Sequence, residues 1–126
     1  MPLEKLDHVN LRTAQLDAMV DWYTNVLGMR RGERPEFPFP GAWMYLGDAI
    51  CVHLVLVDDH PGVGSETDLK LEHFAFRGTD RAEFEAGLKR SGERFKCAEI
   101  SSLSLIQYNI WDPDGNHIHV DFSSIE

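Results

Sequence analysis

A seven-residue segment that occurs twice decides the fold of this chain. Residues 6–12 read LDHVNLR, and residues 71–77 read LEHFAFR. The two segments share Leu, His and Arg at the same places, an acidic residue precedes the histidine in both, and apolar residues match at two further positions. The two histidines, His8 and His73, are 65 residues apart. Such an internal repeat predicts a domain built from two similar modules.

A similar helix is predicted after each copy. Residues 16–27 carry apolar side chains at three- and four-residue spacing, and Gly28 follows as a C-terminal cap. In the second copy, Asp80 and Glu83 have the spacing of a capping box, and the helix they begin is expected to end near Gly92.

Each copy is then predicted to close with strands. The strands are expected at residues 42–47, 50–57, 103–111 and 116–122. Residues 112–115 (DPDG) between the last two are a strong turn signal, and the polar, glycine-rich residues 58–65 separate the copies. We therefore expect one domain over residues 1–126, with a first module at about 1–58, a linker at about 59–68 and a second module at about 69–126.

The composition is that of one globular domain, with 43% hydrophobic and 26% charged residues. Twelve basic and 21 acidic residues give a net charge of −9, which disfavours nucleic acid and anionic membrane surfaces as partners. The N-terminus lacks the features of a signal peptide, and no segment approaches the roughly 18 apolar residues of a membrane span. We therefore predict a cytoplasmic protein with both cysteines reduced and Cys51 a buried thiol.

The histidines of the repeat lie on predicted strands whose two faces differ. Alternate residues of a strand point to opposite sides, so His8 shares a face with Asn10 and Arg12, and His73 shares one with Arg77. The residues between them are mostly apolar and form the face that a helix can cover. Both histidines are therefore expected on the side away from the helix.

Two more histidines are predicted in the last strand of each module. They are His53 and His119, which are 66 residues apart. If the duplication is structural, a pseudo-twofold axis relates the two modules, and four imidazoles converge where the two sheets meet. Imidazole nitrogen binds zinc, iron, nickel, cobalt and copper, so the pattern favours a metal site. The alternative is that each histidine is a hydrogen-bonded core residue.

The other two histidines are interpreted differently. His60 falls in the linker and is expected in solvent. His117 shares strand parity with His119, and only the match of His119 to His53 selects His119 as the ligand. Asp121 lies on the same predicted face and would add a carboxylate to the site if it reached the metal. The roles of His117 and Asp121 stay open on this evidence.

Aromatic and polar side chains on neighbouring strands are candidates for contacts with a substrate. They are Arg12, Trp43, Tyr45, Gln107 and Asn109. Trp43 and Tyr45 alternate on one strand, and Gln107 and Asn109 alternate on another, but the pattern does not say which face points inward. Core packing of the two aromatic residues and ion pairing of Arg12 are the alternatives. No residue is assigned a catalytic role.

These residues carry a family resemblance. The duplicated module, the opening Leu-Asp-His, the helix end at residues 22–29 and the DPDGN motif at residues 112–116 resemble the vicinal oxygen chelate superfamily. That superfamily includes glyoxalase I, extradiol dioxygenases, methylmalonyl-CoA epimerase, fosfomycin resistance enzymes and the metal-free bleomycin resistance proteins. The resemblance covers nearly the whole chain.

The resemblance implies an α+β fold in which two βαβββ modules form open, curled sheets around a metal-binding cleft. It also implies a homodimer, with a cleft built within one chain or across two. The metal ligands would be the residues at the matching positions, which are His8, His53, His73 and His119. Many members have glutamate where this chain has His119, and glyoxalase I has glutamate where it has His53.

These departures shape the functional hypothesis. Neutral ligands alone leave the double positive charge of the ion uncompensated, which favours an anionic substrate or a bound hydroxide. The missing carboxylate weakens the case for proton-shuttling isomerases and for dioxygenases. We therefore hypothesise a metal-dependent enzyme, using Zn, Fe, Ni, Co or Mn, that acts on a small molecule chelating the metal through two adjacent oxygens. The alternatives are a metal-free protein that binds a small aromatic or cationic molecule, and a dimer without catalysis.

Overall fold

The computed structural model describes residues 2–58, 63, 64, 66 and 68–125. The chain divides into two compact units, Met1–Ser65 and Glu66–Glu126, and the division falls inside the segment expected as a linker. His60, which was expected in solvent, lies outside the described residues. The organisation as one domain stays a prediction.

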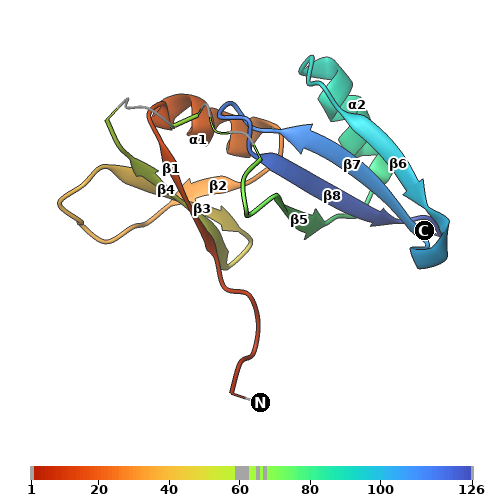
Figure 1. Ribbon diagram of the computed structural model, residues 1–126, viewed down its shortest axis with the longest axis horizontal. Coiled ribbons are helices and arrows are strands. Elements are labelled where there is room, and N and C mark those ends of the chain that lie inside the picture. Colours follow the sequence, from red (N-terminus) through yellow and green to blue (C-terminus); the bar gives the residue numbers. More distant parts are fainter. Residues whose placement is uncertain (1, 59–62, 65, 67, 126) are drawn as a thin grey trace. The chain divides into compact units, whose positions relative to one another are not determined.

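The first unit contains one helix and one four-stranded sheet. Its elements, in chain order, are β1 (Val9–Thr13), α1 (Leu16–Asn25), β2 (Arg30–Gly32), β3 (Gly41–Leu46) and β4 (Ala49–Leu56). The strand order in the sheet is β1-β4-β3-β2. β1 runs parallel to β4, and the other neighbours are antiparallel (Figure 1).

The second unit repeats this arrangement. Its elements are β5 (His73–Arg77), α2 (Arg81–Arg90), β6 (Lys96–Ile100), a 3₁₀ turn at Ser101–Leu103, β7 (Leu105–Trp111) and β8 (His117–Ser123). The strand order is β5-β8-β7-β6, again with only the first pair parallel. Both units are therefore βαβββ modules, which confirms the predicted α+β fold.

Each sheet has one face that packs against a helix. In the first unit, Met44, Val52 and Leu54 of the sheet are buried, as are Met19 and Tyr23 of α1. The buried residues of the second unit follow the same rule, and they are Leu88, Tyr108, Ile110, Ile118, Val120 and Phe122. Because strand side chains alternate, the residues between these positions are on the open face of each sheet.

Two strands lacked a recognisable pattern in the sequence. β2 is only three residues long, and β6 reads KCAEI, so neither shows a clear alternation of apolar and polar residues. β7 begins at Leu105 and not at residue 103, because the 3₁₀ turn occupies the preceding residues. Gly28 has a φ of 72° just after α1, where a left-handed residue is expected to end the helix.

Neither described helix has the length and hydrophobicity that a membrane crossing needs.

Candidate metal centre

An acidic residue holds the first histidine of each repeat. Asp7 Oδ2 lies 2.8 Å from Nδ1 of His8, and Glu72 Oε1 lies 2.7 Å from Nδ1 of His73. The hydrogen bond with His8 lowers the pKa of Asp7, and hydrogen bonds with His117 and then His73 lower the pKa of Glu72. An ionised carboxylate only accepts hydrogen bonds, so each Nδ1 carries a proton, and in the neutral ring the lone pair is on Nε2. Metal-binding histidines are commonly oriented in this way.

In the first unit, His53 lies against His8. β4 places His53 opposite Asn10 of β1 and opposite Trp43 of β3. The rings of His8 and His53 are stacked with centroids 3.9 Å apart, and Trp43 stacks on His53 at 4.5 Å. Burial lowers the pKa of His53, and the neighbouring His8 lowers it further. The His53 ring is therefore held in the neutral form that binds metal.

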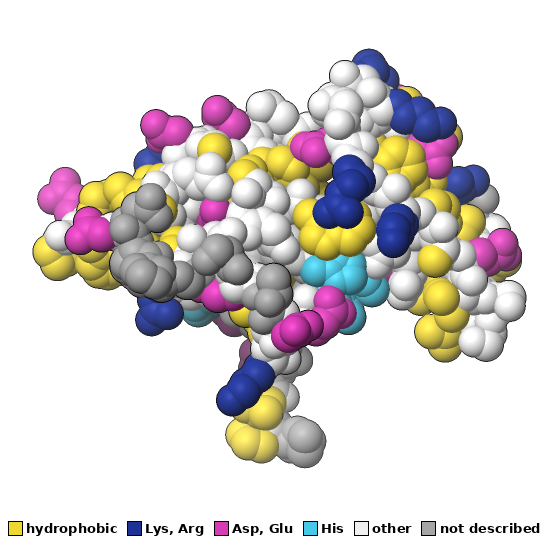
Figure 2. Space-filling model, turned by 45° about the horizontal axis from the view of Figure 1, so that its top comes forward, with side chains coloured by type: hydrophobic (Ala, Val, Ile, Leu, Met, Phe, Trp, Pro, Cys, Tyr) yellow, Lys and Arg dark blue, Asp and Glu magenta, His cyan; other side chains and the backbone are white. Residues whose placement is uncertain are grey.

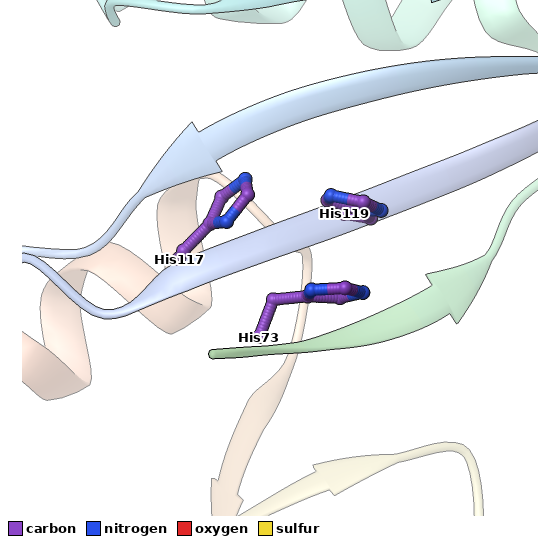
Figure 3. A group of neighbouring side chains, drawn as sticks. All are labelled: His73, His117 and His119. Carbon is purple, nitrogen blue, oxygen red and sulfur yellow. The ribbon is translucent and has the colours of Figure 1, made fainter. Parts of the chain in front are cut away.

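In the second unit, three histidines gather on the open face of the sheet. His73 begins β5, and His117 and His119 alternate along β8 (Figure 3). One ring nitrogen from each lies within 4.8 Å of the others. The rings of His73 and His119 stack at 4.0 Å, and burial lowers the pKa of His119. Two nitrogens on one tetrahedral ion are about 3.4 Å apart, so small ring movements would bring these nitrogens to a shared ion.

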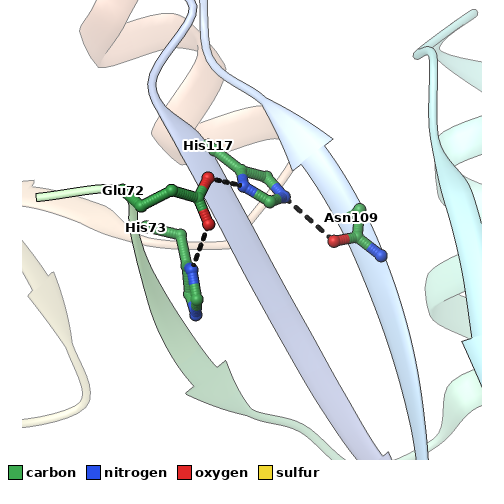
Figure 4. Close-up of polar contacts among 4 residues, drawn as sticks. All are labelled: Glu72, His73, Asn109 and His117. Carbon is green, nitrogen blue, oxygen red and sulfur yellow. Dashed lines mark hydrogen bonds and ion pairs between the residues drawn. The ribbon is translucent and has the colours of Figure 1, made fainter. Parts of the chain in front are cut away.

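Both ring nitrogens of His117 already have partners (Figure 4). Nδ1 lies 2.6 Å from Glu72 Oε2, so this carboxylate bridges His73 and His117. Nε2 of His117 lies 2.9 Å from Oδ1 of Asn109, whose Nδ2 donates to the Lys96 carbonyl at 3.2 Å. The bond to Lys96 fixes the amide orientation, so His117 must release Asn109 before its Nε2 can bind a metal.

Trp111 packs on the far end of this cluster, and sequence reasoning did not identify it. Its ring is nearly parallel to that of His117, with centroids 5.3 Å apart, and the Arg94 guanidinium lies 3.9 Å from its centroid. The available signal was alternation, because Trp111 continues the series of Gln107 and Asn109 along β7.

In the space-filling view, histidine side chains reach the surface beside acidic ones (Figure 2).

The substrate candidates of the first unit lie on its open face. Trp43 contacts His53, as described above. The Tyr45 hydroxyl donates to the Glu33 carbonyl at 2.6 Å, and the Arg30 guanidinium lies 4.6 Å from the Tyr45 ring centroid. Arg12 is exposed. Trp43 therefore contacts His53, a candidate metal ligand, whereas the Tyr45 hydroxyl is hydrogen-bonded to a backbone carbonyl.

The candidates of the second unit are also on the open face. Asn109 lies opposite His119 in the sheet and bonds to His117, so it positions a histidine in this structure. Gln107 lies opposite Asp121. Oδ1 of Asp121 is shielded from solvent and has no hydrogen-bond partner within the described part of the chain. Asp121 thus shares the histidine face, as expected, and its role stays open.

The structure pairs His8 with His53 and His73 with His119, each pair inside its own unit. The binding of one ion by all four remains a prediction. The acidic partners Asp7 and Glu72 were not identified from sequence as holding histidines, although the repeat shows an acid before each of the two histidines. The donor set is nitrogen-rich and partly buried, which suits borderline divalent metals such as zinc.

A family model for the Glyoxalase/Bleomycin resistance protein/Dioxygenase superfamily matches residues 5–120. The chain belongs to this superfamily. Members commonly use divalent metals, bind small molecules and often form dimers. The chain is 28% identical to Glyoxylase I 4 of Arabidopsis thaliana over 123 residues, which are 94% of this chain and 70% of that protein.

Solved structures show the same fold. A glyoxalase family protein of Bacillus anthracis matches with a TM-score of 0.78 and 21% identity, over 96% of each chain. TnmS3, an antibiotic binding protein from Streptomyces sp. CB03234, matches with a TM-score of 0.71 and 20% identity, over 98% of each chain. Because proteins with such different descriptions share the fold, function must be argued from the site.

Proposed function

We propose that this chain is a metal-dependent enzyme of the superfamily, acting on a small oxygenated molecule that chelates the metal through two adjacent oxygens. The ligands would be His8, His53, His73 and His119, with Zn, Fe, Ni, Co or Mn as the ion. The observation that carries the proposal is the carboxylate on Nδ1 of the first histidine in each unit. It leaves both Nε2 atoms free for a metal.

The residues present fit a divalent ion. Burial lowers the pKa of both His53 and His119, so protons compete weakly for these rings at neutral pH. Glu72 would orient His73 and raise its basicity as a ligand. A bound ion would act as a Lewis acid that stabilises negative charge on a substrate oxygen. Neutral ligands preserve the full charge of the ion, which favours an anionic substrate.

The proposed ligand set does not by itself select a class of reaction. No proposed ligand is a carboxylate, so a lyase or isomerase would need a proton carrier from outside the ligand set. Asp121 lies on the same sheet face as the histidines, and one of its oxygens is shielded from solvent. We favour its carboxylate as this proton carrier. We keep lyase, isomerase and dioxygenase chemistry as the three outcomes to be tested.

Elemental analysis of protein purified without a histidine tag tests the proposal. We expect close to one equivalent of divalent metal for each complete site in the parent, and a large loss in His73→Ala. Arg77→Ala is a matched control, because Arg77 is exposed at the other end of the same strand. An oxygen-uptake screen against catechols then separates dioxygenases from the other reactions. Absence of metal after reconstitution with all five ions would reject the proposal.

A metal-free binding protein is the second candidate. The observation in its favour is an aromatic pocket beside His53, described below. Under this alternative, a small aromatic molecule would bind to protein that holds no metal, and the His73 and His119 variants, which lie outside the pocket, would keep that binding. Metal content therefore separates the two candidates.

We also propose a homodimer in the cytoplasm, with neither nucleic acid nor membrane as a partner. Each described sheet has two edge strands, β1 and β2 in the first unit and β5 and β6 in the second, and pairing between copies is one way to protect such edges. Sedimentation equilibrium at micromolar concentration should give twice the monomer mass. A strict monomer would overturn the dimer.

A further inference from the structure

A pocket on the open face of the first sheet lies beside His53, and its other lining residues have no role in the metal site as proposed. Its volume is about 270 Å³, slightly below the usual range for ligand pockets, which suits a molecule with a single ring. Every residue that lines it belongs to the first unit. They include Asn10, Arg34, Phe37, Phe39, Trp43 and His53.

The walls of this pocket are aromatic. The rings of Phe37 and Phe39 are stacked, with centroids 5.2 Å apart and planes 6° from parallel. Phe37 also faces Trp43 at 6.3 Å, and Trp43 stacks on His53. Phe37 and Phe39 are each 41% exposed, although large apolar side chains are usually more deeply buried. The free area of these rings is available to a flat ligand.

The pocket also contains a guanidinium, that of Arg34. The Arg34 carbon Cζ lies 4.9 Å from the Phe37 ring centroid and 5.1 Å from that of Phe39. Nη2 of Arg34 donates to the Phe39 carbonyl at 3.0 Å, and Gly41 leaves room for the guanidinium, because a Cβ there would lie 2.9 Å from Nη2. In the part of the chain that the structure describes, no carboxylate lies within ion-pair distance of Arg34.

These features point to one class of ligand. None of the described residues that line the pocket is acidic, and the positive charge of Arg34 would repel a cation there. A guanidinium whose face stacks on aromatic rings still presents its edge, which binds a carboxylate through two parallel hydrogen bonds. The rings would hold a flat hydrocarbon portion beside that carboxylate.

We propose that this pocket binds an aromatic carboxylate with one ring, with the carboxylate on Arg34 and the ring against Phe37, Phe39 and Trp43. The role of this ligand as the substrate rests on the proposed function, because His53 is shared with the proposed metal site. Binding itself does not require the metal.

Three probes of similar size test the proposal on the full chain after removal of metal. Benzoate has the ring and the charge, benzamide has the ring without the charge, and cyclohexanecarboxylate has the charge without the flat ring. Titration is followed by tryptophan fluorescence, and Trp43→Phe identifies which of the three tryptophans reports. We expect benzoate to bind about tenfold or more tightly than either of the other two. Equal affinity for benzoate and benzamide would overturn the proposal.

Two variants assign the preference to residues. Arg34→Gln should weaken benzoate about tenfold and leave benzamide unchanged. Arg30→Gln removes the same charge from an arginine that stacks on Tyr45 outside the pocket, so it should change neither. Phe37→Leu should remove most of the preference for benzoate over cyclohexanecarboxylate. If Arg30→Gln weakens benzoate as much as Arg34→Gln does, the assignment is wrong.

The outcomes also separate this proposal from the metal site. Benzoate preference without any metal binding would support the pocket and reject the metal-dependent enzyme. Metal binding without benzoate preference would reject the pocket alone. Circular dichroism of each variant confirms that a lost preference does not come from unfolding.

Discussion

The two units share their topology but differ in what stands opposite the second histidine. Trp43 lies opposite His53 in the first sheet and stacks on it. Asn109 lies opposite His119 in the second sheet, and its amide bonds to His117. One open face therefore carries an aromatic wall, and the other carries a hydrogen-bonded histidine cluster.

This difference indicates how the two units of a duplicated fold can take different roles in binding. The first unit has two stacked imidazoles beside an aromatic pocket, and the second has three imidazoles with a carboxylate, Glu72, bridging two of them. The repeat preserves one histidine held by an acid in both units. We infer that the second unit contributes more to holding an ion, and the first more to holding a planar ligand.

The largest expected effect is the loss of metal from ligand variants of the second unit. His73→Ala or His119→Ala should reduce zinc affinity by more than about 100-fold, because each removes a direct ligand where even an outer partner is worth 10- to 100-fold. Isothermal titration of metal-free protein measures this, with Arg77→Ala as the control. His8→Ala and His53→Ala should cause losses of similar size if all four histidines bind one ion.

The contrary result for the first unit is informative. If His8→Ala and His53→Ala leave zinc affinity and stoichiometry unchanged, the first unit contributes no ligand and the site belongs to the second unit alone. In that case His117 becomes the third ligand, and His117→Ala should abolish binding. Under the four-histidine proposal, His117→Ala should change affinity little, and His119→Glu should preserve it.

A smaller difference is expected between the two acidic partners. Glu72→Gln should weaken metal binding by about 10- to 100-fold, because the neutral amide no longer holds Nδ1 of His73 as a carboxylate does. Asp7→Asn should have the same sign and a smaller effect, since Asp7 bonds one histidine and Glu72 bonds two. Zinc competition with a coloured chelator ranks the two variants. A larger loss in Asp7→Asn would reverse the inferred division between the units.

Much of the fold could be predicted because the repeat and the periodicity agree. The repeat at His8 and His73 predicted two modules, and the apolar spacing and alternation predicted both helices and six of the eight strands. β2 and β6 were missed for a physical reason, since three residues in one case and a mixed polar sequence in the other give no periodic signal. Their pairing comes from the neighbouring strands and not from their own residues.

The candidate site was predictable by position but not by contact. Alternation placed His8 and His73 away from the helix, and the duplication placed His53 and His119 near them. In the structure His53 stacks on His8, and His119 stacks on His73. The bridge from Glu72 to His117 depends on side-chain torsions that strand parity does not determine. The pocket around Arg34 was missed as well, because Arg34, Phe37 and Phe39 lie in the loop between β2 and β3, where no periodic pattern exists.

Two tyrosine hydroxyls sharpen the comparison through stability. Tyr108 is fully buried, and its hydroxyl donates to Glu85 at 2.8 Å and accepts from Arg81 at 3.1 Å. Tyr108→Phe should lower the free energy of unfolding by about 1 kcal/mol. Tyr45→Phe, which loses one bond to the Glu33 carbonyl, should cost about half as much. Urea denaturation measures both, and an equal or larger loss in Tyr45→Phe would contradict the ranking.

The smallest expected effect is a pH dependence from the buried rings. Burial lowers the pKa of His53 and His119 from the ordinary value of 6.5, so the unfolded chain binds protons more readily than the folded one. The free energy of unfolding of metal-free protein should therefore be greatest above about 6.5, fall with acidity, and level off below the folded-state pKa. The change should be well under about 1 kcal/mol per ring, because both are partly exposed.

A variant identifies the rings as the source of this dependence. His119→Gln should flatten the slope between about pH 5 and pH 7, whereas the lowered pKa values of Asp7 and Glu72 act at lower pH. Thermal unfolding across this range is the measurement. If the stability of the folded protein increased as the pH fell, the folded state would favour the charged rings, contrary to their burial.

We have proposed that imidazoles from both units bind one metal ion. X-ray absorption spectroscopy of the zinc-loaded protein tests it most directly, because imidazole rings give a characteristic multiple-scattering pattern from which their number is estimated. The account predicts nitrogen at about 2.0–2.1 Å from four imidazoles in the parent, and two fewer imidazoles in the His8→Ala/His53→Ala double variant. An unchanged spectrum in that double variant, or a parent spectrum without imidazole scattering, would contradict it.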